Sequence, residues 1–402
     1  MFESTDTSTT SFAAKIVHET GSKIRSFLYE LAEGTSNYKS LHNLTEQVEH
    51  QYHGRFLIEL LQNAHDALSD QQAQDQESRI EIVLDPNDGE HGVLYVANDG
   101  KPFTESNFRS LSQLGQSDKD PQESIGNKGI GFRSILEITT SPEIYSRSSA
   151  SSSTFDGYCF SFCPTVIEKF KQPIIRLYEG EDHVPSPLGE GIPLVDWGHE
   201  ILQKLRKSIA PKAPTWLPQE LKYLSPYLLP FPISVPPDNP TIQDFQKRGF
   251  VTAIRLPFKN AHSRELAKKK LEALEANTIL FLNRAGSLLL DSGVERRKLD
   301  RRQSRRLPGT HNGHDIVIQD STETEPRFYW IWNKSIKSDE ASDEFRNSLL
   351  ELPGKWPELK ETVISFAVRL GDAPEKGVFS IFLPTELPTG CATHISAPFF
   401  GT

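Results

Sequence analysis

The chain is poor in cysteine and lacks any long hydrophobic run. Its three cysteines, Cys159, Cys163 and Cys391, are too few for a disulfide framework, and no second ligand pair completes a zinc site. No apolar stretch approaches the about 18 residues of a transmembrane helix, and the N-terminus lacks the basic residues and apolar core of a signal peptide. These absences exclude a disulfide-rich secreted scaffold and a membrane-spanning protein, and they predict a cytoplasmic chain with reduced, buried thiols.

Positive charge is also scarce. The 402 residues include 44 Lys and Arg against 54 Asp and Glu, a net charge of −10, so composition gives no general argument for binding nucleic acid or a membrane surface. One segment differs, because residues 296–306 carry seven basic side chains. This run predicts either contact with the phosphates of a nucleic acid or a solvated strand and turn, and the sequence leaves both open.

The first of three informative segments spans residues 56–68, which have the apolar spacing of an amphipathic helix. Glu59, Asn63 and Asp66 follow at i, i+4 and i+7, so they share the polar face of that helix. An amide oxygen can coordinate Mg²⁺, which prefers oxygen ligands. A carboxylate one turn away can position and deprotonate a water molecule. The alternative is a surface helix whose polar residues are solvated.

The second segment is Asn98-Asp99-Gly100, which follows the second of two predicted strands, over residues 79–84 and 92–97. The Asp99 carboxylate could accept a hydrogen bond from the amine of a base, and Gly100 would let the backbone approach a ring closely. The alternative is an Asn-Asp-Gly turn of the common kind.

The third segment places Gly126, Gly129 and Gly131 before a helix predicted over residues 132–138. Glycines at a helix N-terminus allow backbone N–H groups and the helix dipole to face a phosphate. No Gly-Lys-Ser/Thr follows, and no strand–turn–helix unit with a later acidic residue is present. The segment is therefore neither a Walker-type phosphate loop nor a Rossmann motif.

In this order, the three segments resemble the N-box and the two glycine boxes of the GHKL ATPases, which include the Hsp90 chaperones, the MutL proteins and the type II topoisomerases. The amino-acid sequences of residues 52–66 and 125–134 are most similar to those of the Hsp90-like modules of sacsin and of NO VEIN-like proteins. The strong likeness covers roughly residues 35–145.

That resemblance implies roles for the first two segments. Glu59 would be the general base, Asn63 the Mg²⁺ ligand and Asp66 a support of the pocket. Asp99 would anchor adenine, with Gly100 beside it.

The resemblance also implies contacts further along the chain. Thr252, on a strand predicted over residues 248–258, would help to hold the adenine. Residues 103–125 would form a lid over the phosphates, with Ser117 and Lys119 in contact with them, although Lys119 fits a solvated loop equally well. The third segment would line the phosphates with Gly126, Lys128, Gly129, Ile130, Gly131 and Phe132.

We therefore expect an α+β protein in which a Bergerat-type α/β sandwich ATPase domain precedes a second α/β domain, like the transducer or middle domain of the relatives. The expected organisation is a tail and helix over 1–34, the ATPase domain over 35–260 with an insertion at about 165–245, and the second domain over 261–402. The abrupt end predicts truncation at the C-terminus. Residues 327–332 alternate like a half-buried strand, and their aromatics are predicted to be core and not a stacking platform.

The predicted function is Mg²⁺-dependent binding and slow hydrolysis of ATP, which drives a conformational or dimerisation switch in a larger protein. The alternative is a non-hydrolysing ATP-sensing module of a chaperone-like or nucleic-acid-directed defence protein. Expected ligands are ATP or ADP with Mg²⁺. Expected partners are a second copy on ATP binding and either a protein client or a nucleic acid, bound through a region beyond the chain, and no membrane.

Overall fold

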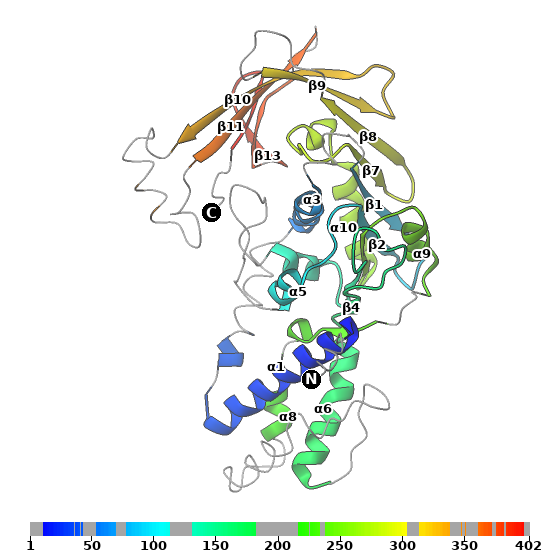
Figure 1. Ribbon diagram of the computed structural model, residues 1–402, viewed down its shortest axis with the longest axis vertical. Coiled ribbons are helices and arrows are strands. Elements are labelled where there is room, and N and C mark those ends of the chain that lie inside the picture. The colour runs from blue at the N-terminus through cyan, green and yellow to red at the C-terminus, as the bar shows by residue number, and fades with distance from the viewer. Residues whose placement is uncertain are drawn as a thin grey trace, which may run out of the picture.

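The computed structural model describes residues 11–35, 37–40, 42, 54–69, 78–112, 131–181, 216–224, 226–233, 238–303, 313–337, 347, 350, 361–371, 375–381 and 383–397. Figure 1 shows the arrangement of their helices and strands. The α-helices are α1 (Phe12–Glu33), α3 (Phe56–Ala67), α5 (Glu105–Ser112), α6 (Pro164–Glu179), α8 (Trp216–Leu221), α9 (Pro240–Lys247) and α10 (Ala261–Glu272). The 3-10 helices are η1 (Gly131–Glu137), η3 (Pro226–Leu228) and η4 (Ala276–Ile279).

The strands alternate with these helices along the chain. They are β1 (Arg79–Asp85), β2 (Val93–Asn98), β3 (Glu143–Ser146), β4 (Phe160–Ser161), β5 (Phe231–Pro232), β6 (Thr252–Pro257), β7 (Ser287–Asp291), β8 (Arg296–Gln303), β9 (Gly313–Asp320), β10 (Arg327–Lys337), β11 (Glu361–Leu370), β12 (Val378–Ile381), β13 (Leu383–Pro388) and β14 (Thr393–Ser396). The fold is mixed α/β, with one 14-stranded sheet of order β13-β12-β14-β11-β10-β9-β8-β7-β1-β2-β6-β3-β4-β5.

The middle of this sheet is covered on both faces. All six residues of β2 are buried, as expected for a strand with packing on both sides. In Figure 1, α3 and α9 lie on opposite sides of β1 and β2. Alternate residues therefore contact different helices: Leu94 and Val96 share a core cluster with Leu60 of α3, whereas Tyr95 and Ala97 share another with Phe245 of α9.

The strands after α10 continue the same sheet. β7 pairs in parallel with β1, with Arg79 opposite Ser287, and β8 then pairs with β7. The strands β9, β10 and β11 form an arch at the top of Figure 1. Its inner side is packed by η4, because Ile279 and Leu280 share one core cluster with Tyr329 and with the buried residues of α3. The expected boundary at residue 260 thus passes between β6 and β7, two strands of one sheet.

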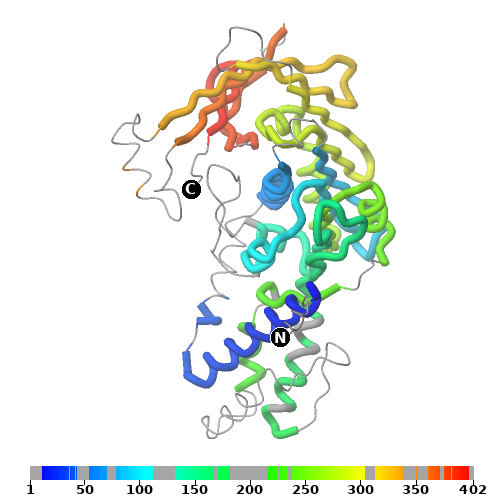
Figure 2. The backbone as a smooth tube through the Cα atoms, viewed as in Figure 1, coloured from blue at the N-terminus to red at the C-terminus, as the bar shows by residue number. Residues whose placement is uncertain are grey.

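The N-terminal helix lies at the other end of the molecule. Figure 2 shows α1 in blue beside the segments that contain α6 and α8. Ile24, Phe27 and Leu28 of α1 share a buried cluster with Leu217 and Leu221 of α8. Ser11 caps the start of α1 by accepting a hydrogen bond from the Ala14 N–H at 3.2 Å, so the predicted first helix is confirmed.

Most predicted elements near the motifs are confirmed. The helix expected over 132–138 is a 3-10 helix, η1. The described part of the insertion expected at about 165–245 contains α8, η3 and β5, and its prolines are tolerated in the first turn of a helix, where no intrahelical N–H bond is lost. The thiols differ too: burial raises the pKa of Cys159 to about 11, whereas Cys391 is exposed.

Candidate nucleotide site

Helix α3 carries the first motif and is buried on most of its surface. Glu59 is 7% exposed, the Asp66 side chain is 6% exposed, and Asn63 is half-buried. The reading of α3 as a surface helix with solvated carboxylates is therefore wrong, because the helix lies between the sheet and η1. A buried carboxylate next to a buried polar neighbour is a typical arrangement at functional sites.

The structure brings the first and third motifs together. The Glu137 carboxylate of η1 accepts a hydrogen bond from the Gly54 N–H, just before α3, at 2.7 Å. Ile135 of η1 shares the core cluster of Leu60 on α3, and Phe132 packs against the same cluster. Gly131 is the first residue of η1. The start of η1 is thus held beside the helix that carries Glu59 and Asn63.

A histidine that the sequence analysis did not single out fixes the other end of α3. His65 is 3% exposed. Its Nε2 lies 3.1 Å from Asn283 Oδ1 and 3.3 Å from the backbone nitrogen of Arg284. Asp66 Oδ1 lies 3.9 Å from His65 Nδ1. This contact ties α3 to the segment between η4 and β7, and only the tertiary structure could identify it.

Asp99 is held by a neighbouring strand. Its carboxylate accepts hydrogen bonds from the Arg79 backbone N–H and from Arg79 Nε, both at 2.8 Å. The Arg79 guanidinium lies over the ring of Phe250, 4.7 Å from its centre, on the α9 side of the sheet. The Asp99 carboxylate is therefore held by a strand neighbour, on the face opposite α3.

Gly100 also has a protein neighbour where a ring was expected. A Cβ at Gly100 would lie 2.3 Å from the carbonyl oxygen of Ala67, the last residue of α3. The Lys101 N–H donates to that same oxygen at 2.7 Å. Glycine is thus required here because the loop after β2 passes directly against the end of α3.

Three buried polar residues lie in a row on the α3 side of the sheet. Asn98 pairs with Thr252 across β2 and β6, and Thr252 pairs with Ser146 across β6 and β3. They are 5%, 3% and 0% exposed, and by strand alternation they share the face of Leu94 and Ile254. The sequence analysis did not predict Asn98 as a site residue. It lies two residues after Val96, so the two-residue period of a strand places it on the core face.

The hydroxyl of Thr252 is the polar group without a partner in this row. Asn98 Oδ1 accepts from the Gly100 N–H at 3.1 Å, and Ser146 Oγ accepts from the Phe103 N–H at 2.9 Å. Thr252 Oγ1 is buried, and no group in the described part of the chain forms a hydrogen bond with it. Leaving a buried hydroxyl unsatisfied costs about 1–3 kcal/mol, so this position is suited to a polar ligand.

Part of the expected site lies outside the described residues. These positions are Ser117, Lys119, Gly126, Lys128, Gly129 and Ile130. Within the described ranges, no three His, Cys, Asp or Glu residues are grouped as a metal site. Asn63 as one protein ligand fits Mg²⁺ nonetheless, because this ion usually keeps several waters and binds mainly to substrate phosphates.

One lysine of α1 is buried with its charge. Burial lowers the pKa of Lys23 to about 8; Glu19, with its carboxylate 3.5 Å away, opposes this shift and the charge of Arg133 adds to it. Arg133 belongs to η1 and is 5% exposed.

We expect Lys23→Met to stabilise the chain at neutral pH. The folded pKa of Lys23 lies below its ordinary value of 10.5, so its charged form opposes folding below pH 8 and this cost disappears as the pH rises from 8 to 10.5. The free energy of unfolding should increase by about 1–3 kcal/mol at pH 7 and hardly at all at pH 10. Urea unfolding at both values measures this, with the exposed Lys247→Met as the control. A less stable Lys23→Met at pH 7 would contradict the prediction.

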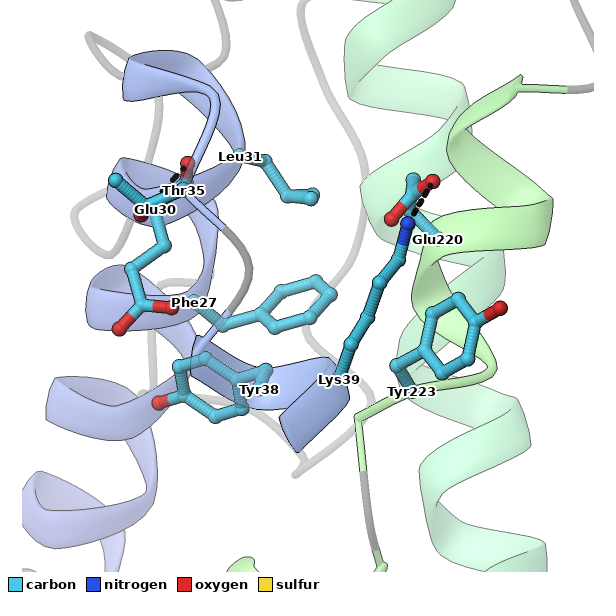
Figure 3. A pocket seen from close by; sticks show the side chains of 8 residues that line it. All are labelled: Phe27, Glu30, Leu31, Thr35, Tyr38, Lys39, Glu220 and Tyr223. Atoms are coloured by element: carbon cyan, nitrogen blue, oxygen red, sulfur yellow. Dashed lines mark hydrogen bonds and ion pairs between the residues drawn. The ribbon is translucent and has the colours of Figure 1, made fainter. Parts of the chain in front are cut away.

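A small pocket, partly open to solvent, lies away from these motifs, between α1 and α8. Figure 3 shows Phe27 and Leu31 on one side and Lys39, Glu220 and Tyr223 on the other. Lys39 Nζ lies 3.1 Å from a Glu220 oxygen and 4.9 Å from the centre of the Tyr223 ring. Its cation is already paired, so the pocket offers no free charge for a phosphate.

In the part of the chain that the structure describes, no helix has the length and apolar character needed to span a membrane. This observation agrees with the sequence, which has no apolar run of that length.

Comparison with known proteins finds similarity over the segment that carries the three motifs. Residues 38–173 match the family model "Sacsin domain", and this stretch holds all three motifs. A 92-residue stretch is 35% identical to Protein NO VEIN of Arabidopsis thaliana, and it covers 23% of this chain and 3% of that protein. The chain thus spans a small fraction of its relative. Its N-terminal half contains a segment similar to the sacsin domain, and this supports a relationship to sacsin and NO VEIN.

Proposed function

We propose that this chain binds Mg-ATP on the α3 side of the sheet, between α3, η1 and the ends of β2 and β6, and hydrolyses it slowly. Turnover would reset a conformational or dimerisation switch in a larger protein. The observation that carries the proposal is the buried hydroxyl of Thr252, which lacks a hydrogen-bond partner among the described residues. It lies on the face that α3 covers, in a row with Asn98 and Ser146.

The chemistry of the surrounding side chains supports this choice. Glu59 is a buried carboxylate on α3 and would orient the attacking water and accept its proton. Asn63, one turn further, would contribute its amide oxygen to Mg²⁺, which when bound neutralises phosphate charge. Gly131 opens η1 beside α3, where backbone N–H groups can face a phosphate.

The contact with the base is assigned to Thr252, with Asn98 beside it. Asp99 accepts two hydrogen bonds from Arg79, and its two carboxylate oxygens keep further lone pairs that could accept one from the amine of adenine. Asp99 would then anchor the base and also hold the end of β2 against the start of β1. The sacsin-domain match, which includes Glu59, Asn63 and Asp99, supports a nucleotide site of the sacsin type.

Thr252→Val tests the proposal through two measurements that should change in opposite directions. Removing an unsatisfied buried hydroxyl should raise the free energy of unfolding of the ligand-free chain by about 1 kcal/mol. The same change should weaken ATP binding about fivefold, the worth of one hydrogen bond. Chemical denaturation and titration calorimetry with ATP in Mg²⁺ measure the two effects.

Thr139→Val is the matched control. Thr139 is equally buried, but its hydroxyl accepts a hydrogen bond from the Ser141 N–H at 3.2 Å. This variant should lose stability and bind ATP normally. If Thr252→Val binds ATP as the wild type does, the assigned base contact is wrong, and if the wild type binds no ATP at all, the whole proposal fails.

A further inference from the structure

The strand β10 turns its large aromatic residues away from the core. Tyr329 and Ile331 are buried on the inner side of the arch, so strand alternation places Phe328, Trp330 and Trp332 on its outer side. Phe328 is 47% exposed, and both tryptophans are only half-buried. The alternation predicted from the sequence is confirmed. The prediction that the aromatics of this strand are core is confirmed for Tyr329 and wrong for Phe328, Trp330 and Trp332.

Neighbouring strands extend this apolar surface. Opposite Phe328, Trp330 and Trp332 on β11 lie Leu370, Val368 and Phe366, and Ile395 of β14 lies beside Phe366. We call these residues, with their cross-strand neighbours on β8 and β9, the outer face. Within the described ranges none of the seven named apolar residues is buried, and contiguous exposed apolar surface marks an interaction site.

One aromatic ring on the outer face packs against a neighbouring strand. A Cβ at Gly313 of β9 would be 2.7 Å from Cζ2 of Trp330 and 3.0 Å from its Nε1. The indole therefore packs against the bare backbone of Gly313. The Trp332 and Phe366 rings lie 5.4 Å apart at 36°. Several half-buried rings on one surface offer a platform on which nucleic-acid bases can stack.

The outer face is also locally basic. On β8 the outer positions are Arg296, Lys298, Asp300 and Arg302, because Leu299 and Arg301 are buried on the inner side. Lys298 pairs with Asp300 at 2.8 Å. Strand pairing places Arg302 of β8 in line with Val317 of β9 and Phe328 of β10. The backbone of Arg302 therefore lies two strand spacings, about 10 Å, from β10.

The sum of charges over the outer positions of β8 to β11 is positive. Arg296, Lys298, Arg302 and Lys334 oppose Asp300 and Asp315, so four minus two gives +2, on a chain whose net charge is −10. The remaining basic residues of β8 turn inward: Arg297 pairs with Asp320, and Arg301 donates to the Leu280 carbonyl. Positive charge therefore follows the edge of the aromatic surface.

We propose that the outer face binds single-stranded nucleic acid, with bases stacked on Trp330, Trp332 and Phe366 and phosphates along β8. An apolar face alone would suit a protein partner equally. The basic row on an acidic chain, beside half-buried aromatic rings, favours a polyanion with aromatic rings. A duplex hides its base faces, so a single strand is the ligand that this surface can contact. The inference does not depend on ATP binding.

The test uses the full chain without ATP. It measures the fluorescence anisotropy of labelled oligo-dT and oligo-U of about 20 nucleotides. Binding should weaken as salt rises from about 50 to 200 mM. Trp330→Leu keeps an apolar side chain but removes the π-face, and it should weaken binding at least about fivefold. Trp216→Leu on α8, at the opposite end of the molecule, is the matched control.

A charge variant provides the second arm. Arg296→Gln with Arg302→Gln should reduce the slope of log affinity against log salt by roughly 1.4. Lys247→Gln with Lys269→Gln removes two exposed charges elsewhere and should leave the slope unchanged. The proposal is overturned by absence of binding at low salt, by equal or tighter binding of duplex, or by affinity that ignores the outer-face changes. A dimer that Trp330→Leu weakens, with no oligonucleotide bound, identifies a protein interface on the outer face and also overturns the proposal.

Discussion

Glu59→Ala is expected to lower the ATPase rate of the full chain by about 10²-fold or more, while ATP affinity stays close to that of the wild type. A positioned general base contributes about 10²–10⁴-fold. Glu59 is the carboxylate on α3 one turn before Asn63, and it is only 7% exposed. A buried carboxylate close to the bound phosphates can orient one water without competition from bulk solvent.

Because Glu59 is buried, alanine could also disturb packing. Glu59→Gln keeps the shape, replaces one acceptor oxygen by an NH2 donor and cannot accept the proton, so it should lose turnover to the same extent. Its melting curve shows separately whether the packing around α3 is kept. Glu265→Gln on the exposed surface of α10 is the control. Single-turnover hydrolysis of radiolabelled ATP and calorimetric titration separate chemistry from binding.

The outcomes separate the two functional readings. Equal turnover in Glu59→Gln and wild type would remove Glu59 as the base. A wild type that binds ATP but releases no phosphate would favour the non-hydrolysing ATP-sensing module. In that case the nucleotide would act only by stabilising one conformation of the chain.

Gly100→Ala is expected to destabilise the chain by roughly 3 kcal/mol or more. The added methyl group would lie 2.3 Å from the carbonyl oxygen and 2.5 Å from the carbonyl carbon of Ala67. Both are backbone atoms at the end of α3, so no side-chain rotation can relieve the overlap. Forcing the loop away would also strain the 2.7 Å hydrogen bond from the Lys101 N–H to the Ala67 oxygen. Overpacking of this kind commonly costs about 1–3 kcal/mol, and more when backbone must move.

Gly89→Ala is the matched control for this effect. Gly89 has φ of 73° but nothing lies within 4 Å of the added Cβ, so only the left-handed backbone contributes, at about 1–2 kcal/mol. Urea unfolding of both variants gives the comparison. If Gly100→Ala lowers the free energy of unfolding no more than Gly89→Ala does, the contact of Gly100 with α3 is looser than described.

The sequence by itself determined the local elements and one candidate motif set. Short runs of apolar and β-branched residues predicted β1 and β2, and helical periodicity predicted α1 and α3, because both depend only on near neighbours in the chain. The resemblance in the three motifs pointed to the segment that the sacsin-domain model matches. Alternation along β2 would also have assigned Asn98, not Asp99, to the core face.

The tertiary structure decided what depends on residues far apart in the chain. The Asp99 carboxylate accepts a hydrogen bond from Arg79 because β1 and β2 pair with Ile80 opposite Asn98. The β7 strand completes the central sheet only because it lies in parallel beside β1. The indole of Trp330 packs closely on the backbone because an adjacent strand brings Gly313 beside it. Long-range pairing selects one register among many that satisfy the same local pattern, so neither composition nor periodicity could reveal these contacts.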